Sequence, residues 1–150
     1  MPHTLQELSD RLEINDLLVR YSHAIDTKNF DLLDQVFTPD ADLDYTQAGG
    51  PSGKYPEIKQ WLIKALAPFP AYQHMVSNSM VTIDGDTGTG RTMCHNPMVY
   101  ERDGKKDVFY CGLWYLDRYV RTPEGWRIRE RSEEHGYDHG LPEDLRVPEL

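Results

Sequence analysis

The chain has 150 residues, of which 39% are hydrophobic and 27% charged, and its formal net charge is −9. This length fits one domain with a core of its own, and the acidic balance argues against nucleic acid and anionic membranes as partners, because both attract basic surfaces. No apolar run is long enough to cross a membrane and the N-terminus lacks the apolar core of a signal peptide, so we expect a cytoplasmic protein.

Residues 4–27 have the pattern of a long amphipathic helix. Thr4 and Glu7 match a capping box, in which each side chain bonds the backbone N–H of the other. Apolar residues then recur at three- and four-residue steps, which predicts one continuous buried face. The residues of this expected face are Leu5, Leu8, Leu12, Leu17, Leu18, Tyr21, Ala24 and Ile25.

Shorter elements follow this helix. Residues 30–37 predict a short second helix with Asn29 as its N-cap. Alternating apolar and polar residues at 41–45 predict a short strand, and 46–52 a glycine-rich loop. A third amphipathic helix is expected over 56–66, where a proline occupies the first turn.

The second half of the chain is predicted to form β-strands. Residues 72–83, 87–101, 107–120 and 126–131 are strand-like and are separated by turn residues, so we expect them to form an antiparallel sheet. From about residue 136 we expect an irregular C-terminal tail. Helices followed by a run of strands predict an α+β domain spanning the whole chain, with a curved sheet wrapped around the long helix and a pocket on its concave face.

Three residue types suggest a general-base site. Tyr21 and Asp26 lie near the end of the first helix, and His74 lies where a long strand begins. If the fold brings them together, Asp26 can orient the imidazole and His74 can remove a proton from carbon. A phenol can then donate to the oxygen that gains negative charge.

Several short sequence segments resemble the NTF2-like superfamily, in particular its SnoaL-like branch. The similarity covers roughly residues 5–135 and implies a cone in which a curved mixed or antiparallel β-sheet wraps around a long N-terminal helix, with two further helices. The segments that show this similarity are Tyr21-Ser22-His23-Ala24-Ile25-Asp26, Phe37-Thr38-Pro39-Asp40-Ala41, Gln73-His74-Met75-Val76-Ser77-Asn78, Asp84-Gly85-Asp86, Tyr115-Leu116-Asp117-Arg118 and Gly125-Trp126-Arg127-Ile128.

The resemblance also implies which residues act. Scytalone dehydratase, bile-acid 7α-dehydratase and hexachlorocyclohexane dehydrochlorinase carry the aspartate and histidine that Asp26 and His74 match. Tyr21 is similar in position to a tyrosine of the bile-acid enzymes, and Tyr45 to one of scytalone dehydratase. His95 falls near the second histidine of scytalone dehydratase. That enzyme's later serine and asparagine have no counterpart here, so scytalone is not the expected substrate.

Other pocket residues follow from strand alternation. Only one of His95 and Asn96 can face the pocket, and the sequence leaves open which: His95 would protonate a leaving group, and Asn96 would hold a substrate oxygen. Trp114 and Tyr115 belong to an aromatic stretch from which one or two residues are expected to line the pocket. His135 follows the last strand and is expected to close the pocket mouth.

These observations favour a cofactor-independent lyase of dehydratase type, or a related isomerase or cyclase. The expected substrate is a hydrophobic oxygenated ring compound such as a steroid, a polyketide or an aromatic catabolite. No cofactor motif is present, and the acidic and histidine-containing stretch 133–139 matches no zinc spacing, so no metal is expected. Cys94 and Cys111 are expected to be free thiols.

Two other functions and one assembly are compatible with the sequence. The same fold can serve as a non-catalytic binding module. Epoxide hydrolysis by an activated water is a further alternative, with Arg91 and Asp117 as its charged residues. A homo-oligomer is expected because an open sheet leaves an apolar outer face to cover; the dehydratase-like relatives favour a trimer, and a dimer is the other possibility.

Overall fold

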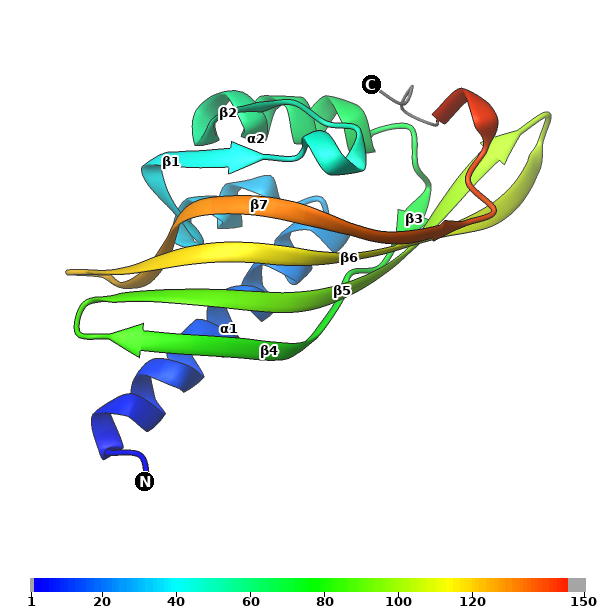
Figure 1. Cartoon of the computed structure of the whole chain (residues 1–150). Coiled ribbons are helices and arrows are strands. Elements are labelled where there is room, and N and C mark those ends of the chain that lie inside the picture. Colours follow the sequence, from blue (N-terminus) through cyan, green and yellow to red (C-terminus); the bar gives the residue numbers. More distant parts are fainter. Residues whose placement is uncertain (1, 146–150) are drawn as a thin grey trace.

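A long helix lies across the concave face of a curved sheet (Figure 1). The computed structural model describes residues 2–145. Helix α1 runs over Leu5–Asp26 and α2 over Tyr55–Leu66, and three short 3-10 helices, η1, η2 and η3, cover Phe30–Gln35, Thr46–Ala48 and Glu143–Leu145. The strands are β1 Phe37–Asp44, β2 Ser52–Lys54, β3 Ala71–Tyr72, β4 Met75–Asp84, β5 Thr87–Arg102, β6 Lys105–Thr122 and β7 Gly125–His139.

The seven strands form one mixed sheet in the order β2-β1-β7-β6-β5-β3, with β4 also paired to β5. The pairing of β1 with β7 is parallel, and the others are antiparallel. Figure 1 shows α1 behind this sheet and α2 beside β1 and β2 at one end. The α+β cone expected from the sequence is confirmed.

Helix α1 begins as predicted but buries a different face. The capping box is present, since Thr4 Oγ1 accepts from the Glu7 N–H and the Glu7 carboxylate accepts from the Thr4 N–H. Leu5, Leu8 and Leu12, however, are exposed by 87%, 45% and 66%. The expected apolar face is therefore wrong in its first half, because these three leucines lie on the side of α1 opposite to the buried Asp10 and Ile14.

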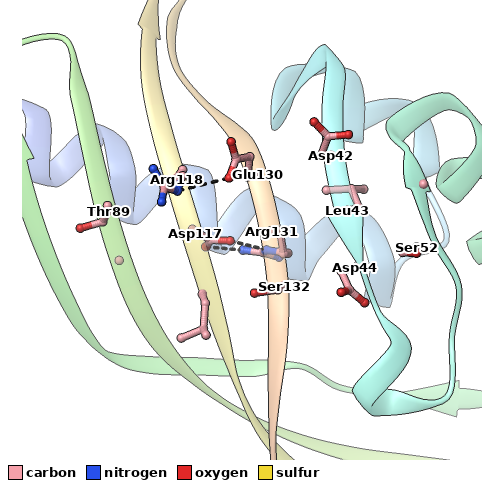
Figure 2. Close-up of a pocket in the computed structure, with 13 residues that line it drawn as sticks. Asp42, Leu43, Asp44, Ser52, Thr89, Asp117, Arg118, Glu130, Arg131 and Ser132 are labelled. Atoms are coloured by element: carbon pink, nitrogen blue, oxygen red, sulfur yellow. Dashed lines mark hydrogen bonds and ion pairs between the residues drawn. The ribbon is translucent and has the colours of Figure 1, made fainter.

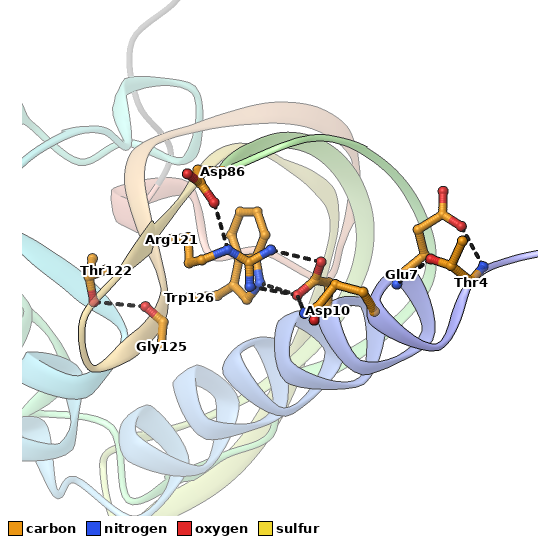
Figure 3. A network of polar contacts seen from close by, with 9 residues as sticks. Thr4, Glu7, Asp10, Asp86, Arg121, Thr122, Gly125 and Trp126 are labelled. Carbon is orange, nitrogen blue, oxygen red and sulfur yellow. Dashed lines mark hydrogen bonds and ion pairs between the residues drawn. The ribbon is translucent and has the colours of Figure 1, made fainter.

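Asp10 occupies the buried position where the core side of α1 begins. It is 2% exposed and accepts hydrogen bonds from the Arg121 guanidinium at 2.8 and 2.9 Å, from Trp126 Nε1 at 3.0 Å and from Gln6. Arg121 also binds Asp86 at 2.8 Å, so one cation joins the helix to two sheet turns (Figure 3). These donors, with Arg121 foremost, lower the pKa of Asp10.

The segment after α1 differs from the prediction in two ways. The second helix is a 3-10 turn that ends at Gln35, and β1 already begins at Phe37. Pro39 lies inside β1, which sequence alone argues against, because proline cannot donate to a strand ladder. Between Phe37 and Asp42 the register of β1 against β7 shifts, and this irregularity accommodates the missing N–H.

The predicted strand 72–83 is two strands separated by a break at Gln73 and His74. Gln73 N–H still bonds Pro97 O at 3.1 Å, but His74 has left the ladder. The backbone N–H of His74 is thus available to another acceptor.

Strand β7 extends further than the sequence suggested. It continues to His139, so residues 136–139 are sheet and the tail predicted from about 136 is wrong at its start. Its pairing with β6 shifts register between Gly112 and Leu113. The longer strand adds side chains beyond Arg131 to the concave face.

The outer face of the sheet carries exposed apolar side chains, among them Met80 at 74%, Tyr137 at 51% and Leu116 at 36%. Self-association through this face stays a prediction. Within residues 2–145, no helix combines the length and the apolar character needed to cross a membrane.

Replacing Asp10 should destabilise the fold. We expect Asp10→Asn to lower the free energy of unfolding by about 1–3 kcal/mol, because it removes a charged acceptor from Arg121 and Trp126. A lowered pKa means that the carboxylate stabilises the fold at pH values well above 3.8, and that this contribution is lost as the pH falls through the lower value in the folded state. The difference between wild type and variant should therefore shrink in acid.

Urea unfolding of wild type and Asp10→Asn across the acid range measures this difference. Asp16→Asn, at an exposed position of the same helix, is the matched control and should change stability by less than about 0.5 kcal/mol. Equal effects of the two substitutions would contradict the role given to Asp10.

Candidate active site

A cavity of about 960 Å³ opens between α1, α2 and the concave face of the sheet. Aromatic and aliphatic side chains make most of its wall, as in pockets for small organic ligands. A few polar groups interrupt this wall. They are Tyr21, Tyr45, Gln47, His74, Asn96, Tyr115, Glu133, His135 and Asp138.

His74 and Asp26 meet in the wall of this cavity. His74 Nδ1 lies 2.7 Å from Asp26 Oδ1, and the His74 backbone N–H donates to Asp26 Oδ2 at 2.9 Å. An ionised carboxylate only accepts, so Nδ1 carries the proton and Nε2 keeps its lone pair. Nε2 makes no hydrogen bond within residues 2–145, and the imidazole can accept a proton there.

The backbone and ring of His74 are held from several sides. Ser22 Oγ donates to His74 O at 2.6 Å, which ties the strand break to α1. The rings of Tyr21 and Tyr72 stand edge-on to the imidazole, with centroids 6.4 and 5.8 Å away. Tyr72 is fixed in turn by its hydroxyl, which donates to Ile25 O at 2.9 Å. The imidazole is therefore preorganised before any ligand binds.

Tyr21 and Tyr45 form a phenol pair beside this histidine. Their hydroxyl oxygens are 3.1 Å apart, and both residues are 3% exposed. Burial raises the pKa of both phenols, so both remain protonated near neutral pH. One O–H bridges the pair, and the other is free to donate. Gly50 allows this packing, because a Cβ there would lie 2.9 Å from Tyr45 Cβ.

A buried ion pair packs against the ring of Tyr21, one member of the phenol pair. Arg131 donates to Asp117 at 2.7 and 2.8 Å, and both side chains are 0% exposed (Figure 2). The guanidinium carbon lies 4.3 Å from the ring centroid of Tyr21 and 4.0 Å from that of Tyr115. This cation–π arrangement positions a tyrosine of α1 against a tyrosine of β6.

Glu133 is a cavity residue that the sequence reasoning missed. It follows Arg131 by two residues on β7, pairs in register with Tyr115 of β6, and is 8% exposed. Its Oε2 has no hydrogen-bond partner. Burial raises the pKa of Glu133 to about 8, against an opposing effect of Arg131. Strand parity with Arg131 was the available signal, but the strand was expected to end at residue 131.

The structure decides which of His95 and Asn96 faces the cavity. Asn96 lines the cavity, and its Oδ1 is buried without a partner. His95 points to the outer face, where its Nδ1 lies 2.9 Å from the Tyr137 hydroxyl and its ring stacks on Tyr110. The predicted catalytic role of His95 is therefore wrong for this structure, since Cys94 and Asn96 take the inward positions.

Two further sequence candidates lie on the outer face. Trp114 does not line the cavity; the Arg91 guanidinium covers its ring at 4.2 Å and pairs with Glu134 at 2.9 Å. The substrate-binding role predicted for Trp114 is thus wrong, whereas its neighbour Tyr115 does face the cavity. With Arg91 outside and Asp117 committed to Arg131, the charged set suggested for epoxide hydrolysis is not assembled.

The cavity mouth is bordered by the end of β7. His135 lines the cavity there as an exposed residue, and its Nε2 lies 2.9 Å from Asp138 Oδ2. The His135 backbone N–H donates to Gln47 Oε1 at 2.9 Å, which ties the η2 turn to the strand. Leu141 and Leu145 complete this rim.

The two cysteines are free thiols, as expected. Cys94 is buried, and Cys111 lines the cavity. Burial raises the pKa of each thiol to about 12, so neither is a thiolate near neutral pH. This disfavours a cysteine nucleophile.

Comparisons with known proteins place the chain among relatives. A sequence profile of the SnoaL-like domain family matches residues 6–132. An uncharacterised protein of Mycobacterium tuberculosis is 56% identical over 130 residues, which cover 87% of this chain and 88% of that protein. A solved protein of Kribbella flavida has a TM-score of 0.82 at 27% identity, covering 89% of this chain and 95% of that one.

A more distant structure has the same fold. The hexachlorocyclohexane dehydrochlorinase of Novosphingobium barchaimii superposes with a TM-score of 0.78 at 18% identity, over 97% of this chain and 99% of that one. At this identity the likeness concerns the fold alone.

The carboxyl of Glu133 should make stability depend on pH. Its folded-state pKa lies above its ordinary value of 4.5, so between 4.5 and about 8 the folded state holds a proton that the unfolded state has lost. The contribution of this group therefore falls as the pH rises through that window. Glu133→Gln should remove this slope and be about 1–3 kcal/mol more stable than wild type near pH 9.

Chemical unfolding of wild type and variant at a series of pH values checks this expectation. Glu101→Gln, at an exposed position of β5, is the control and should leave the slope of the wild type unchanged. An unaltered slope in Glu133→Gln would show that Glu133 ionises normally.

Proposed function

This chain belongs to the SnoaL-like domain family, and we propose that it is a cofactor-independent lyase acting on hydrophobic oxygenated ring compounds. The reaction is a dehydratase-like elimination started by removal of a proton from carbon. The observation that carries the proposal is the 2.7 Å contact of His74 Nδ1 with Asp26 in the wall of a largely apolar cavity.

His74 is the general base. Its Nε2 accepts the proton from the carbon beside a carbonyl, and Asp26 stabilises the imidazolium that forms. The backbone hydrogen bond from His74 to the same carboxylate keeps the pair aligned during this transfer. A low-dielectric wall strengthens the attraction between the two charges.

Tyr21 and Tyr45 stabilise the oxygen of the resulting enolate. Donors placed in advance where negative charge develops are among the largest contributors to enzymatic rates. Both phenols are protonated near neutral pH, and their mutual contact leaves one O–H for the substrate. Collapse of the enolate then forms the carbon–carbon double bond and expels the oxygen on the next carbon.

An isomerase or cyclase of the same family would share the first step. Each begins with removal of a proton beside a carbonyl, and differs in where the electron pair goes next. A non-catalytic binding module is the other class of function. It has no need of a carboxylate aligned on the histidine of its cavity wall, so the Asp26–His74 geometry favours an enzyme.

Loss of the base should abolish proton exchange. We expect His74→Gln to slow hydrogen–deuterium exchange of bound cyclic ketones by about 10²- to 10⁴-fold, because a general base contributes that much. Asp26→Asn should slow it less, since the imidazole remains but loses its anionic partner. The assay incubates hydroxylated cyclic ketones with the protein in D2O and follows label uptake and loss of water by mass spectrometry.

His23→Gln is the matched control, since His23 is an exposed histidine of α1. It should exchange like wild type, and all three variants should keep the wild-type melting temperature within a few degrees. Wild-type exchange rates in both His74→Gln and Asp26→Asn would refute the proposed base.

The phenol pair should behave as a unit. Tyr21→Phe and Tyr45→Phe should each slow exchange by about tenfold or more, and the double variant should be little slower than the worse single one, because residues that act together are not additive. Fully additive losses would show that the two hydroxyls act separately. Exchange rates of the three variants on one ketone measure this coupling.

A further inference from the structure

The charged residues that line the cavity do not suit an anionic ligand. Among the cavity residues within 2–145 there is no lysine or arginine. Arg131 lies below the wall, fully buried and bound to Asp117. An anionic ligand would lose its water without gaining a cation, which is costly in an apolar cavity. The cavity therefore suits uncharged molecules.

Glu133 is a buried carboxyl in the sheet wall of this cavity. It is more than nine-tenths buried, and no donor within residues 2–145 bonds its Oε2. A carboxylate without donors is poorly stabilised, whereas a neutral carboxylic acid needs only an acceptor for its proton. The structure thus favours a carboxylic acid that presents one O–H donor.

The surroundings of Glu133 keep this proton in place up to moderately alkaline pH. Arg131 opposes the effect of burial, and Asp44 of β1 adds to it. The other titratable groups around the cavity are phenols and thiols, which are neutral near neutral pH, together with two imidazoles and a further carboxyl. They are Tyr21, Tyr45, Tyr115, Cys94, Cys111, His74, His135 and Asp138.

We propose that Glu133 is the catalytic acid of this site and that the substrate is an uncharged ring compound whose departing oxygen receives the Glu133 proton. This assignment rests on the proposed elimination at His74. His74 lies next to β4 and Glu133 on β7, with β5 and β6 between them, so the base and the acid come from separate parts of the wall. The neutral amide of Asn96 lies on the intervening strand β5.

The step balances as an elimination of water. His74 Nε2 takes the proton from carbon, the carbon–oxygen bond of the neighbouring carbon breaks, and the departing hydroxyl takes the proton of Glu133. The products are an unsaturated carbonyl compound and water, with His74 protonated and Glu133 ionised. Return of one proton from His74 to Glu133 through solvent restores the starting state.

Binding of three naphthalenes of nearly equal shape tests the acid without any turnover. The probes are 2-acetylnaphthalene, 2-naphthoate and 2-isopropenylnaphthalene, which carry a neutral acceptor, an anion and no oxygen. Near pH 7, the neutral ketone should bind wild type at least about tenfold more tightly than the carboxylate. Its affinity should fall about three- to tenfold between about pH 7 and pH 9.5, because the Glu133 donor is lost whereas the buried phenols of Tyr21 and Tyr45 stay protonated.

Glu133→Gln keeps an N–H donor and cannot ionise in this range. Ketone affinity in this variant should be independent of pH, and the oxygen-free probe should show no pH dependence in either protein. The wild-type titration needs no variant, so it decides the question even if Glu133→Gln fails to fold. A flat wild-type titration, tighter binding of the carboxylate, or no binding of the two neutral probes would overturn the proposal.

A second measurement separates this proposal from the general base. On 3-hydroxycyclohexanone in D2O, Glu133→Gln should lose water elimination by about tenfold or more and keep label uptake at the carbon beside the carbonyl, whereas His74→Gln should lose both. Absence of label uptake in wild type would count against the proposed base alone. Equal elimination by wild type and Glu133→Gln would count against Glu133 alone.

Discussion

The guanidinium of Arg131 between two tyrosine rings is the contact on which the site depends. It ties α1 to the sheet, since Tyr21 comes from the helix and Tyr115 from β6, and Asp117 neutralises it at 2.7 Å. A buried cation is tolerated only with such a partner, so loss of Asp117 would leave an uncompensated charge under the cavity. The position of Tyr21 in turn fixes where Tyr45 places its hydroxyl.

Helix α1 continues from Tyr21 to its last residue, Asp26, which lies beside the strand break at His74. Tyr21 and Asp26 lie on the same α1, so the stacking of one constrains the approach of the other to His74. The strand break contributes equally, because a His74 N–H engaged in the ladder could not bond the carboxylate. Helix position and broken strand together set the geometry of the base, and neither depends on a ligand.

Much of this arrangement could be predicted from local patterns. The long helix and the three hairpins that connect β4 to β7 follow from capping, periodicity and turn residues, which act over a few neighbours, whereas the pairing of Asp26 with His74 was implied mainly by the family resemblance. The placement of His95 could not be predicted, because alternation gives two faces without saying which is inward; the packing of the helices against one face of the sheet decides it. The exposure of Leu5, Leu8 and Leu12 could not be predicted either, since the spacing of apolar residues does not tell which side of the helix packs on the sheet.

Glu133 was missed for a related reason. The end of β7 is acidic and polar, which local patterns read as a tail, while the pairing of Glu133 with Tyr115 keeps it in the sheet. Long-range pairing overrides local composition here. A buried carboxyl without a partner is therefore recognised only once the strand register is known.

The break at Gln73 and His74 has a consequence for how such a site can change. The base is held by backbone hydrogen bonds and by the end of a helix, whereas the walls of the cavity come from side chains on β5, β6, β7 and α2. Side chains of these walls can be exchanged without moving the imidazole. Reactivity and ligand preference can thus evolve separately, because reactivity depends on the backbone at the strand break and ligand preference depends on the side chains of the cavity wall.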